Sequence, residues 1–142
     1  MRSSEDRLTA ADYKALADFR HALRKFLDFS ASAAQREGVP PQQHQALLAV
    51  KGVSEGEVLT VGALAERLFI APHSATELVG RLVSGGYLAR ETDITDRRRQ
   101  TLHLTPFAEE VLQKLSSAHL HEIRELAPHL IQILNHFRLP SD

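Results

Sequence analysis

Residues 87–105 read YLARETDITDRRRQTLHLT and contain two short runs in which apolar and polar residues alternate. A period of two is typical of half-buried β-strands. The first run covers 87–92 and the second 99–104, and the segment between them is rich in residues that favour turns. The pattern predicts an antiparallel hairpin with one packed face and one face open to water, on which Thr101 and His103 lie.

The turn of this hairpin carries three consecutive arginines, Arg97, Arg98 and Arg99, directly after Asp96. Three adjacent cations repel one another unless a polyanion or neighbouring acids neutralise them. Considered alone, the turn is compatible both with a solvated charged loop and with a nucleic-acid contact. The segment immediately upstream favours the nucleic-acid contact.

Residues 60–86 predict two short helices with a tight connection. Thr60 is a suitable N-cap for the first helix, and Pro72 suits the first turn of the second. Apolar residues recur in the second helix at the i, i+3, i+4, i+7 spacing of one buried face, and Gly85-Gly86 ends the helix. The opposite face is small and polar, so it can approach base edges in a major groove. The DNA-binding residues expected on this face are His73, Ser74, Thr76, Glu77 and Arg81.

Helix, turn, helix and hairpin in this order are typical of a winged helix-turn-helix. The segment 65–105 resembles the MarR (multiple antibiotic resistance regulator) family of bacterial transcription factors. An Asp-x-Arg motif followed after five residues by Leu-Thr is a fairly specific signature when it directly follows a helix-turn-helix. Pro72 and Glu77 depart from the polar or basic residues that such proteins often carry in the recognition helix. The residues that carry the resemblance are Arg81-Leu82-Val83, Gly86-Tyr87-Leu88, Asp96-Arg97-Arg98 and Leu104-Thr105.

The resemblance implies a regulator that binds double-stranded DNA as a homodimer, most often as a repressor. It maps the Asp-x-Arg motif onto Asp96 and Arg98, so that the carboxylate holds the guanidinium while the arginine enters the minor groove. We expect Arg97 and Arg99 to contact phosphates. The resemblance also implies a small aromatic or lipophilic effector. The residues expected to line an effector pocket are Tyr13, Phe19 and His44, for which a place in the core or at an interface is the alternative.

Both ends of the chain predict long helices. Apolar residues recur at spacings of three and four within 8–30, and they cover more than one side of the helix. After the hairpin, a helix is expected to begin at Thr105-Pro106, to break at Pro128 and then to restart. Because helices with such wide apolar surfaces are usually covered by others, we expect 8–30 and 106–138 to form a homodimer interface. An ordinary intrachain core is the alternative.

The predicted fold is therefore mainly α with a small antiparallel β wing. It is a winged helix-turn-helix whose long terminal helices form a dimerisation domain. A further helix between Pro40-Pro41 and Gly52 belongs to the DNA-binding lobe, which spans 40–105 with the wing at 87–105. Residues 1–142 are enough for a single domain with a core of its own.

Composition limits the other possibilities. The net charge is only -1, but DNA binding depends on where positive charge lies rather than on its sum. The sequence contains no run of about 18 apolar residues and no recognisable signal peptide, so we expect a cytoplasmic protein without membrane contact. The absence of cysteine excludes sensing through a thiol.

Two other functions remain open, and an enzyme is not expected. Eight histidines raise the possibility of a metal-responsive regulator, but His119 and His121 are two apart on a helix and point to different sides. We therefore predict no metal or other cofactor. A winged-helix module that contacts only proteins is the second alternative, although an apolar wing would suit it better. The sequence shows no nucleophile with a base, no phosphate loop and no paired carboxylates.

Overall fold

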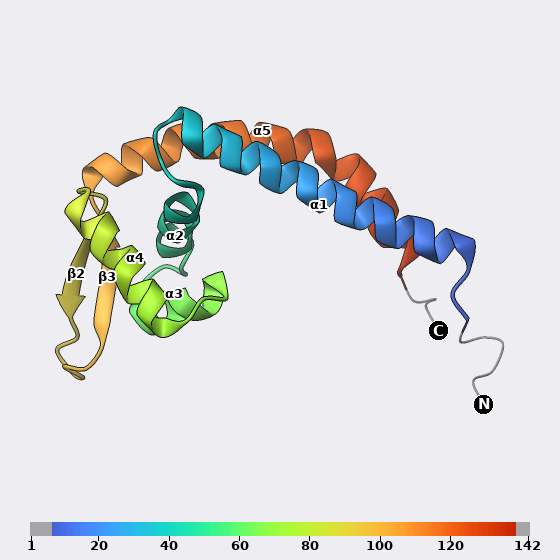
Figure 1. The fold of residues 1–142 in the computed structure, drawn as a ribbon. Coiled ribbons are helices and arrows are strands. Elements are labelled where there is room, and N and C mark those ends of the chain that lie inside the picture. The colour runs from blue at the N-terminus through green and yellow to red at the C-terminus, as the bar shows by residue number, and fades with distance from the viewer. Residues whose placement is uncertain (1–6, 139–142) are drawn as a thin grey trace. The chain divides into compact units, whose positions relative to one another are not determined.

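The structure is a computed structural model that describes residues 7–138. It divides into two units: a winged unit, Ser32–Ser117, and a helical unit made by the two ends of the chain, Met1–Ala31 and Ala118–Asp142. The fold is mainly helical with one small antiparallel sheet, as predicted. The elements in chain order, drawn in Figure 1, are α1 (Ala10–Arg36), α2 (Pro41–Lys51), β1 (Leu59–Thr60), α3 (Val61–Leu68), α4 (Pro72–Ser84), β2 (Leu88–Thr92), β3 (Gln100–Leu104) and α5 (Pro106–His136).

In the winged unit, α3 and α4 form the predicted helix-turn-helix. The Thr60 hydroxyl oxygen accepts a hydrogen bond from the Ala63 backbone N–H at 3.1 Å and so caps α3. After α3 the backbone of Phe69 is left-handed, with φ of 55°, and it turns the chain before Pro72 begins α4. Gly86, with φ of 81°, lets the chain leave α4 for the sheet. The cap, the turn and the helix end therefore lie where the sequence predicts them.

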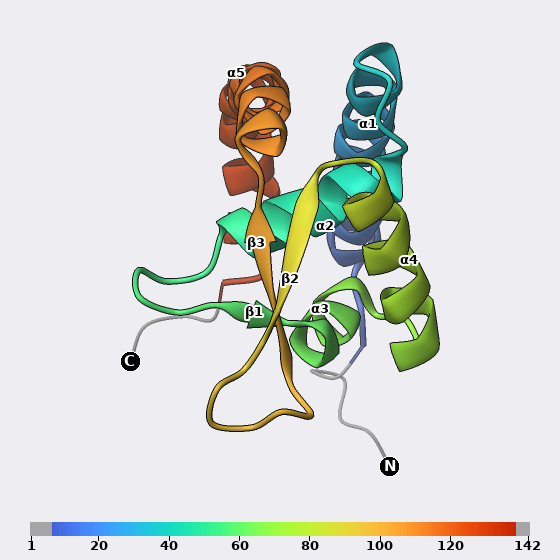
Figure 2. The same cartoon turned by 90° about the vertical axis from the view of Figure 1, so that its left-hand side faces the viewer.

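The wing is a three-stranded antiparallel sheet with the strand order β1-β3-β2 (Figure 2). The predicted hairpin is present as β2 and β3, but β1 was missed because two residues are too short to show alternation. β3 is the central strand, so Thr101 has neighbours on both sides, Thr60 on β1 and Glu91 on β2. Thr101 is buried, and its hydroxyl donates to the Glu91 carbonyl at 3.3 Å. The prediction that Thr101 lies on an open face is therefore wrong, whereas His103 is half-exposed.

The winged unit has a core built mainly from leucines. Five leucine side chains, contributed by α2, α3, α4 and β3, are each at most 2% exposed. Burial of one such side chain contributes about 1.5–3 kcal/mol to stability. The fully buried leucines of this cluster are Leu47, Leu64, Leu78, Leu82 and Leu102, and Leu115 of α5 is fully buried in a second cluster.

In the helical unit, the first part of α1 and the last part of α5 run antiparallel and in contact. Asp12 Oδ1 lies 2.9 Å from His136 Nε2 near the ends of the chain. Farther along the seam, Ser30 Oγ lies 2.7 Å from His119 Nε2. Ile133 is buried between these two contacts. Side chains far apart in the sequence therefore tie the two helices together.

The prediction that α5 breaks at Pro128 is wrong, because the helix continues to His136. Proline removes one backbone hydrogen bond and crowds the carbonyl of the residue four positions earlier. The long helical segments on both sides and the tertiary contacts with α1 offset that cost. The predicted start is confirmed, since the Thr105 hydroxyl oxygen accepts a hydrogen bond from the Ala108 N–H at 3.2 Å.

α1 is longer than the sequence analysis predicts. The prediction ended near Ser30, whereas the helix continues to Arg36. It ends before Gly38, whose φ of 74° is the left-handed conformation that commonly follows a helix. Within residues 7–138, none of the helices combines the length and the apolar character that a membrane span requires.

Candidate nucleic-acid interface

The predicted base-reading residues share one side of α4. His73, Thr76, Glu77 and Arg81 are exposed, and Ser74 is half-buried. The other side of the helix is held against the core by four buried residues, Ala75, Leu78, Val79 and Leu82. The amphipathic pattern therefore fixes which side of α4 faces outward.

The exposed side of α4 offers both hydrogen-bond donors and acceptors. The Thr76 hydroxyl already donates to the Pro72 carbonyl at 3.1 Å, so its methyl group and oxygen lone pairs remain available. An ionised Glu77 only accepts hydrogen bonds, whereas Arg81 only donates them. Base edges in a major groove present both kinds of group, so this surface can distinguish among them.

The loop of the wing is organised by two aspartates. Asp93 accepts hydrogen bonds from the hydroxyl and the backbone N–H of Thr95, at 2.8 and 2.9 Å, and these bonds hold the pKa of Asp93 below its usual value. Arg99 Nη1 lies 3.9 Å from the same carboxylate and lowers the pKa further. Asp96 Oδ1 accepts from the Arg98 backbone N–H at 3.0 Å and lies 3.4 Å from Arg98 Nε. The expected contact between Asp96 and Arg98 is therefore present, and the Arg98 side chain is 93% exposed.

Two large apolar side chains of the winged unit were not predicted as site residues. Phe69, in the turn before α4, and Ile94, in the loop of the wing, are each 97% exposed. Both lie in turns, where apolar periodicity gives no signal. A left-handed conformation is also costly for a residue with a Cβ atom, so Phe69 is strained as well as exposed.

The three predicted effector residues fall in different units. Tyr13 and Phe19 lie on α1 in the helical unit, where Tyr13 is 61% exposed and Phe19 is half-buried in an apolar strip with Leu16 and Leu23. His44 lies on α2 in the winged unit and is 3% exposed. The burial of His44 agrees with the alternative of a place in the core. The structure does not bring the three side chains together within one unit.

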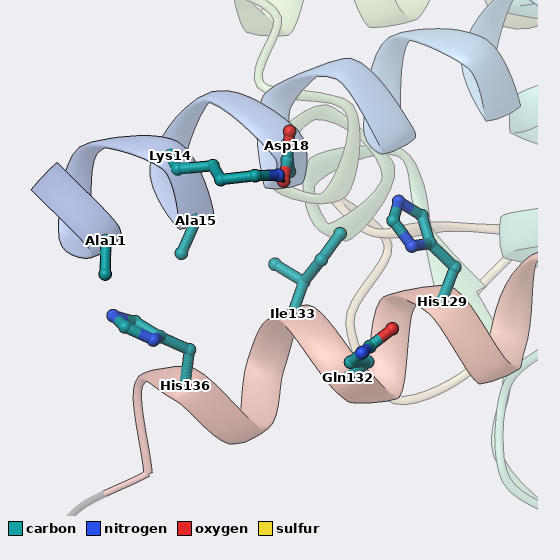
Figure 3. A pocket seen from close by; sticks show the side chains of 8 residues that line it. All are labelled: Ala11, Lys14, Ala15, Asp18, His129, Gln132, Ile133 and His136. Carbon is teal, nitrogen blue, oxygen red and sulfur yellow. Dashed lines mark hydrogen bonds and ion pairs between the residues drawn. The ribbon is translucent and has the colours of Figure 1, made fainter.

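A separate hollow in the helical unit lies between the ends of α1 and α5. Figure 3 shows Ile133 rising from α5 toward α1, with His129 and His136 on either side of it. On α1, Lys14 Nζ lies 2.6 Å from Asp18 Oδ2, and this hydrogen bond lowers the pKa of the Asp18 carboxyl. None of the predicted effector residues lines this hollow.

The histidines do not form a metal centre in the part of the chain that the structure describes. No three histidine or carboxylate side chains among residues 7–138 are grouped closely enough to hold one ion. His119 instead packs edge-on against Phe26 and Phe29, with ring centroids 6.1 and 5.5 Å away. This histidine belongs to the packing between α1 and α5.

Comparison with known proteins finds a family model, curated relatives and solved structures that are similar to this chain. Residues 37–99 match the family model described as "MarR family". A Thauera aromatica protein, provisionally assigned as a transcriptional regulatory protein for the hcr operon, is 27% identical over 78% of this chain and 65% of its own length. An uncharacterized HTH-type transcriptional regulator of Bacillus subtilis (strain 168), YcgE, is 36% identical over 57% of this chain and 51% of its own length. The chain thus spans about two thirds and one half of these relatives.

A solved structure extends the likeness over almost the whole chain. The crystal structure of Sco3205, a MarR family transcriptional regulator from Streptomyces coelicolor, in complex with DNA, is similar with a TM-score of 0.70. The match covers 99% of this chain and 95% of that one, at 22% sequence identity, and it shows that the two share a fold. The residues matched by the family model, 37–99, include Asp96 and Arg98. Over residues 37–99 the chain is therefore similar to the MarR family, and the curated proteins that it resembles are described as transcriptional regulators.

Proposed function

We propose that this chain is a sequence-specific DNA-binding regulator that acts as a homodimer on a pseudo-palindromic operator. We further propose that it is a repressor whose affinity for DNA is lowered by a small ligand. One observation carries the first proposal: the winged unit exposes the polar side of α4 together with the Arg98 side chain of the wing. A helix suits a major groove, and an arginine on a hairpin suits an adjacent minor groove. The DNA complex of Sco3205 supports the same assignment.

The residues divide by role. His73, Ser74, Thr76 and Glu77 would contact base edges, and Arg81 would contact both base edges and phosphates. Asp96 would hold Arg98 in the orientation that enters the minor groove, where a narrow groove concentrates negative potential. Phosphate contacts are assigned to Arg97 and Arg99.

The homodimer is supported by apolar side chains that the helical unit leaves uncovered. Monomeric proteins rarely expose large contiguous apolar surfaces. A second copy of the chain is the favoured partner because two-fold symmetry would present two recognition helices to a pseudo-palindrome, about one helical turn apart. The side chains concerned are 39–58% exposed and are Leu16, Leu23, Leu27, Leu120, Ile123, Ile131, Leu134 and Phe137.

Ligand response is the least directly supported part of the proposal. A ligand changes DNA affinity only if it binds more tightly to a dimer whose recognition helices no longer match the groove spacing. We retain Tyr13, Phe19 and His44 as the residues to test for effector binding. The aromatic ring of Phe19 in its apolar strip and the buried imidazole of His44 are suited to aromatic or lipophilic molecules.

A winged module that binds only proteins is the second candidate. The observation that favours it is the exposure of Phe69 and Ile94, because large exposed apolar side chains are commonly covered by a partner. This candidate predicts no measurable affinity for duplex DNA. It would also leave the exposed arginines of the wing without an assigned role.

Selection from a randomised duplex library tests the DNA-binding proposal. The purified protein should enrich a pseudo-palindrome, and variants at Ser74 should enrich a related site with a changed base in each half. Failure to enrich any duplex even at low salt, where phosphate contacts are strongest, would contradict DNA binding. It would leave the protein-interaction module as the better function.

A separate screen tests the ligand response. Aromatic acids and other lipophilic metabolites should include one that raises the melting temperature and weakens binding to the selected duplex. Zinc followed by a chelator is the matched control. If zinc weakens DNA binding, the chelator restores it and no organic compound has an effect, the protein responds to a metal and not to the proposed organic effector.

A further inference from the structure

The winged unit contains a hollow between α3 and the wing. The residues that line the hollow come from the end of β1, the start of α3, α4, the end of the wing loop and the start of β3. Figure 2 shows α3 beginning where β1 ends, beside the sheet. The volume of this hollow, about 360 Å³, is well above the roughly 30 Å³ that a water molecule occupies in the liquid. The lining residues of this hollow, here called the Gly62 hollow, are Thr60, Val61, Gly62, Thr76, Arg98, Arg99 and Gln100.

The lining of the Gly62 hollow is suited to an anion. It includes two guanidinium groups, those of Arg98 and Arg99, and no carboxylate is among the lining residues of the described chain. Asp96 and Asp93 contact these arginines but do not line the hollow. Each arginine therefore keeps most of its five N–H donors for a ligand.

The Thr60 hydroxyl group also makes the hollow suited to an anion. The Thr60 oxygen accepts from the Ala63 N–H, so the hydroxyl hydrogen of Thr60 remains to be donated. The Thr76 hydroxyl hydrogen is already donated to Pro72, so this side chain forms a wall of the hollow. The groups left to bind a ligand are donors, and most of them carry positive charge.

Gly62 itself has no explanation within the fold. Glycine is less favourable in a helix than alanine. A Cβ atom built on Gly62 would meet no other atom within 4 Å, and its φ does not lie in the left-handed region that favours glycine. The chain therefore gives no steric reason for glycine at a residue that lines a cationic hollow. A ligand that must come close to the backbone of α3 would explain why this residue is glycine.

We propose that the Gly62 hollow seats one phosphate of the DNA backbone, held by Arg99 and Thr60 beside the minor-groove Arg98, and that Gly62 lets this phosphate approach the backbone of α3. This inference rests on the proposed function, since it names a contact of the same DNA complex. A phosphodiester suits the site because it is a compact anion with several acceptor oxygens, whereas base edges are uncharged. The contact would fix the register of α4 in the groove without reading sequence.

The test is a double-mutant cycle on the full-length protein and the selected duplex. Gly62→Ala should raise the melting temperature, because alanine favours the helix, yet weaken DNA binding about tenfold. Duplexes with a single neutral methylphosphonate at each position should reveal one phosphate per half-site whose neutralisation weakens the wild type. The same neutralisation should have little effect on Gly62→Ala. Arg99→Gln should lose sensitivity at that same phosphate.

Gln42→Ala is the matched control, because Gln42 is an exposed, neutral residue of α2 outside the hollow. It should leave affinity and phosphate sensitivity unchanged. If the wild type binds duplex but Gly62→Ala keeps its affinity and its sensitivity at every phosphate, this inference is overturned while the proposed function stands. If the wild type binds no duplex, the proposed function fails first.

Inorganic phosphate alone separates a free anion from the DNA backbone. If it stabilises the wild type but not Gly62→Ala, and no methylphosphonate position distinguishes the two proteins, the hollow binds a free anion. That result would overturn the assignment to DNA.

Discussion

In the winged unit, Leu64 and Leu82 have no exposed surface, whereas in the helical unit Leu16, Leu27 and Ile131 are 43%, 58% and 58% exposed. The two units are made of similar residue types, so the difference is one of arrangement. Three helices and a sheet can enclose leucines on several sides, but two antiparallel helices can bury only the seam between them. The winged unit therefore has a core of its own, whereas the helical unit leaves an apolar surface exposed.

The largest expected effect concerns the core of the winged unit. Leu82→Ala should lower the free energy of unfolding by about 2–5 kcal/mol, because it removes a fully buried side chain and leaves a cavity. Leu48→Ala is the matched control in the same unit, since Leu48 is 49% exposed and should cost much less. Chemical denaturation of both variants measures the difference. Equal losses would mean that the winged unit does not enclose its core as described.

In the helical unit, α5 contains an internal proline, Pro128, which interrupts the backbone hydrogen bonds of the helix. Pro128→Ala should stabilise the protein by up to about 3 kcal/mol, since it restores a backbone donor and removes the crowding by the ring. Thermal unfolding measures the gain. A loss of stability would show that the proline shapes α5 for a contact that a regular helix cannot make.

The next largest effect is expected on the proposed dimer, through a substitution in the exposed apolar strip of α1. Leu27→Asp should raise the dissociation constant of the dimer at least about 100-fold, or 2.7 kcal/mol, because it would bury a charge at the interface. Ala17→Asp, at an exposed position of α1 outside the strip, is the control and should leave the dimer intact. Sedimentation equilibrium over a range of concentrations measures both. A wild type that stays monomeric at high concentration would remove the dimer from the account.

The smallest effect is expected at the turn before α4. Phe69→Gly should stabilise the winged unit by about 0.5–1 kcal/mol, because glycine adopts the left-handed conformation without a steric cost. Phe69→Ala removes the same exposed ring but keeps a Cβ atom, so it should remain close to the wild type. Thermal unfolding of the pair separates backbone strain from the loss of the ring.

The parts of the fold that sequence predicted well depend on local signals. The cap at Thr60, the start of α4 at Pro72 and the contact between Asp96 and Arg98 each involve residues within a few positions of one another. Short-range chemistry decides such features, so the residue types alone are informative.

The features that sequence missed depend on tertiary context. The burial of Thr101 follows from a strand that is distant in sequence, and the continuity of α5 through Pro128 follows from contacts with α1. The Gly62 hollow is formed by residues from several elements that are distant in the sequence, so no local pattern marks it. The effector residues remain a prediction for a related reason: Tyr13 and His44 belong to different units.

The central claim is that the winged unit binds DNA through its wing, and the salt dependence of binding tests it most directly. The dissociation constant of the selected duplex should be measured against salt for the wild type, Arg98→Ala and Arg124→Ala. Arg124 is an exposed arginine of the helical unit, so its variant removes the same charge from a region with no assigned DNA contact. Arg98→Ala should bind more weakly, with a log-log slope shallower by about one unit or less, while Arg124→Ala keeps the wild-type slope. If Arg98→Ala keeps both the affinity and the slope of the wild type, the wing is only a solvated hairpin and the account is contradicted.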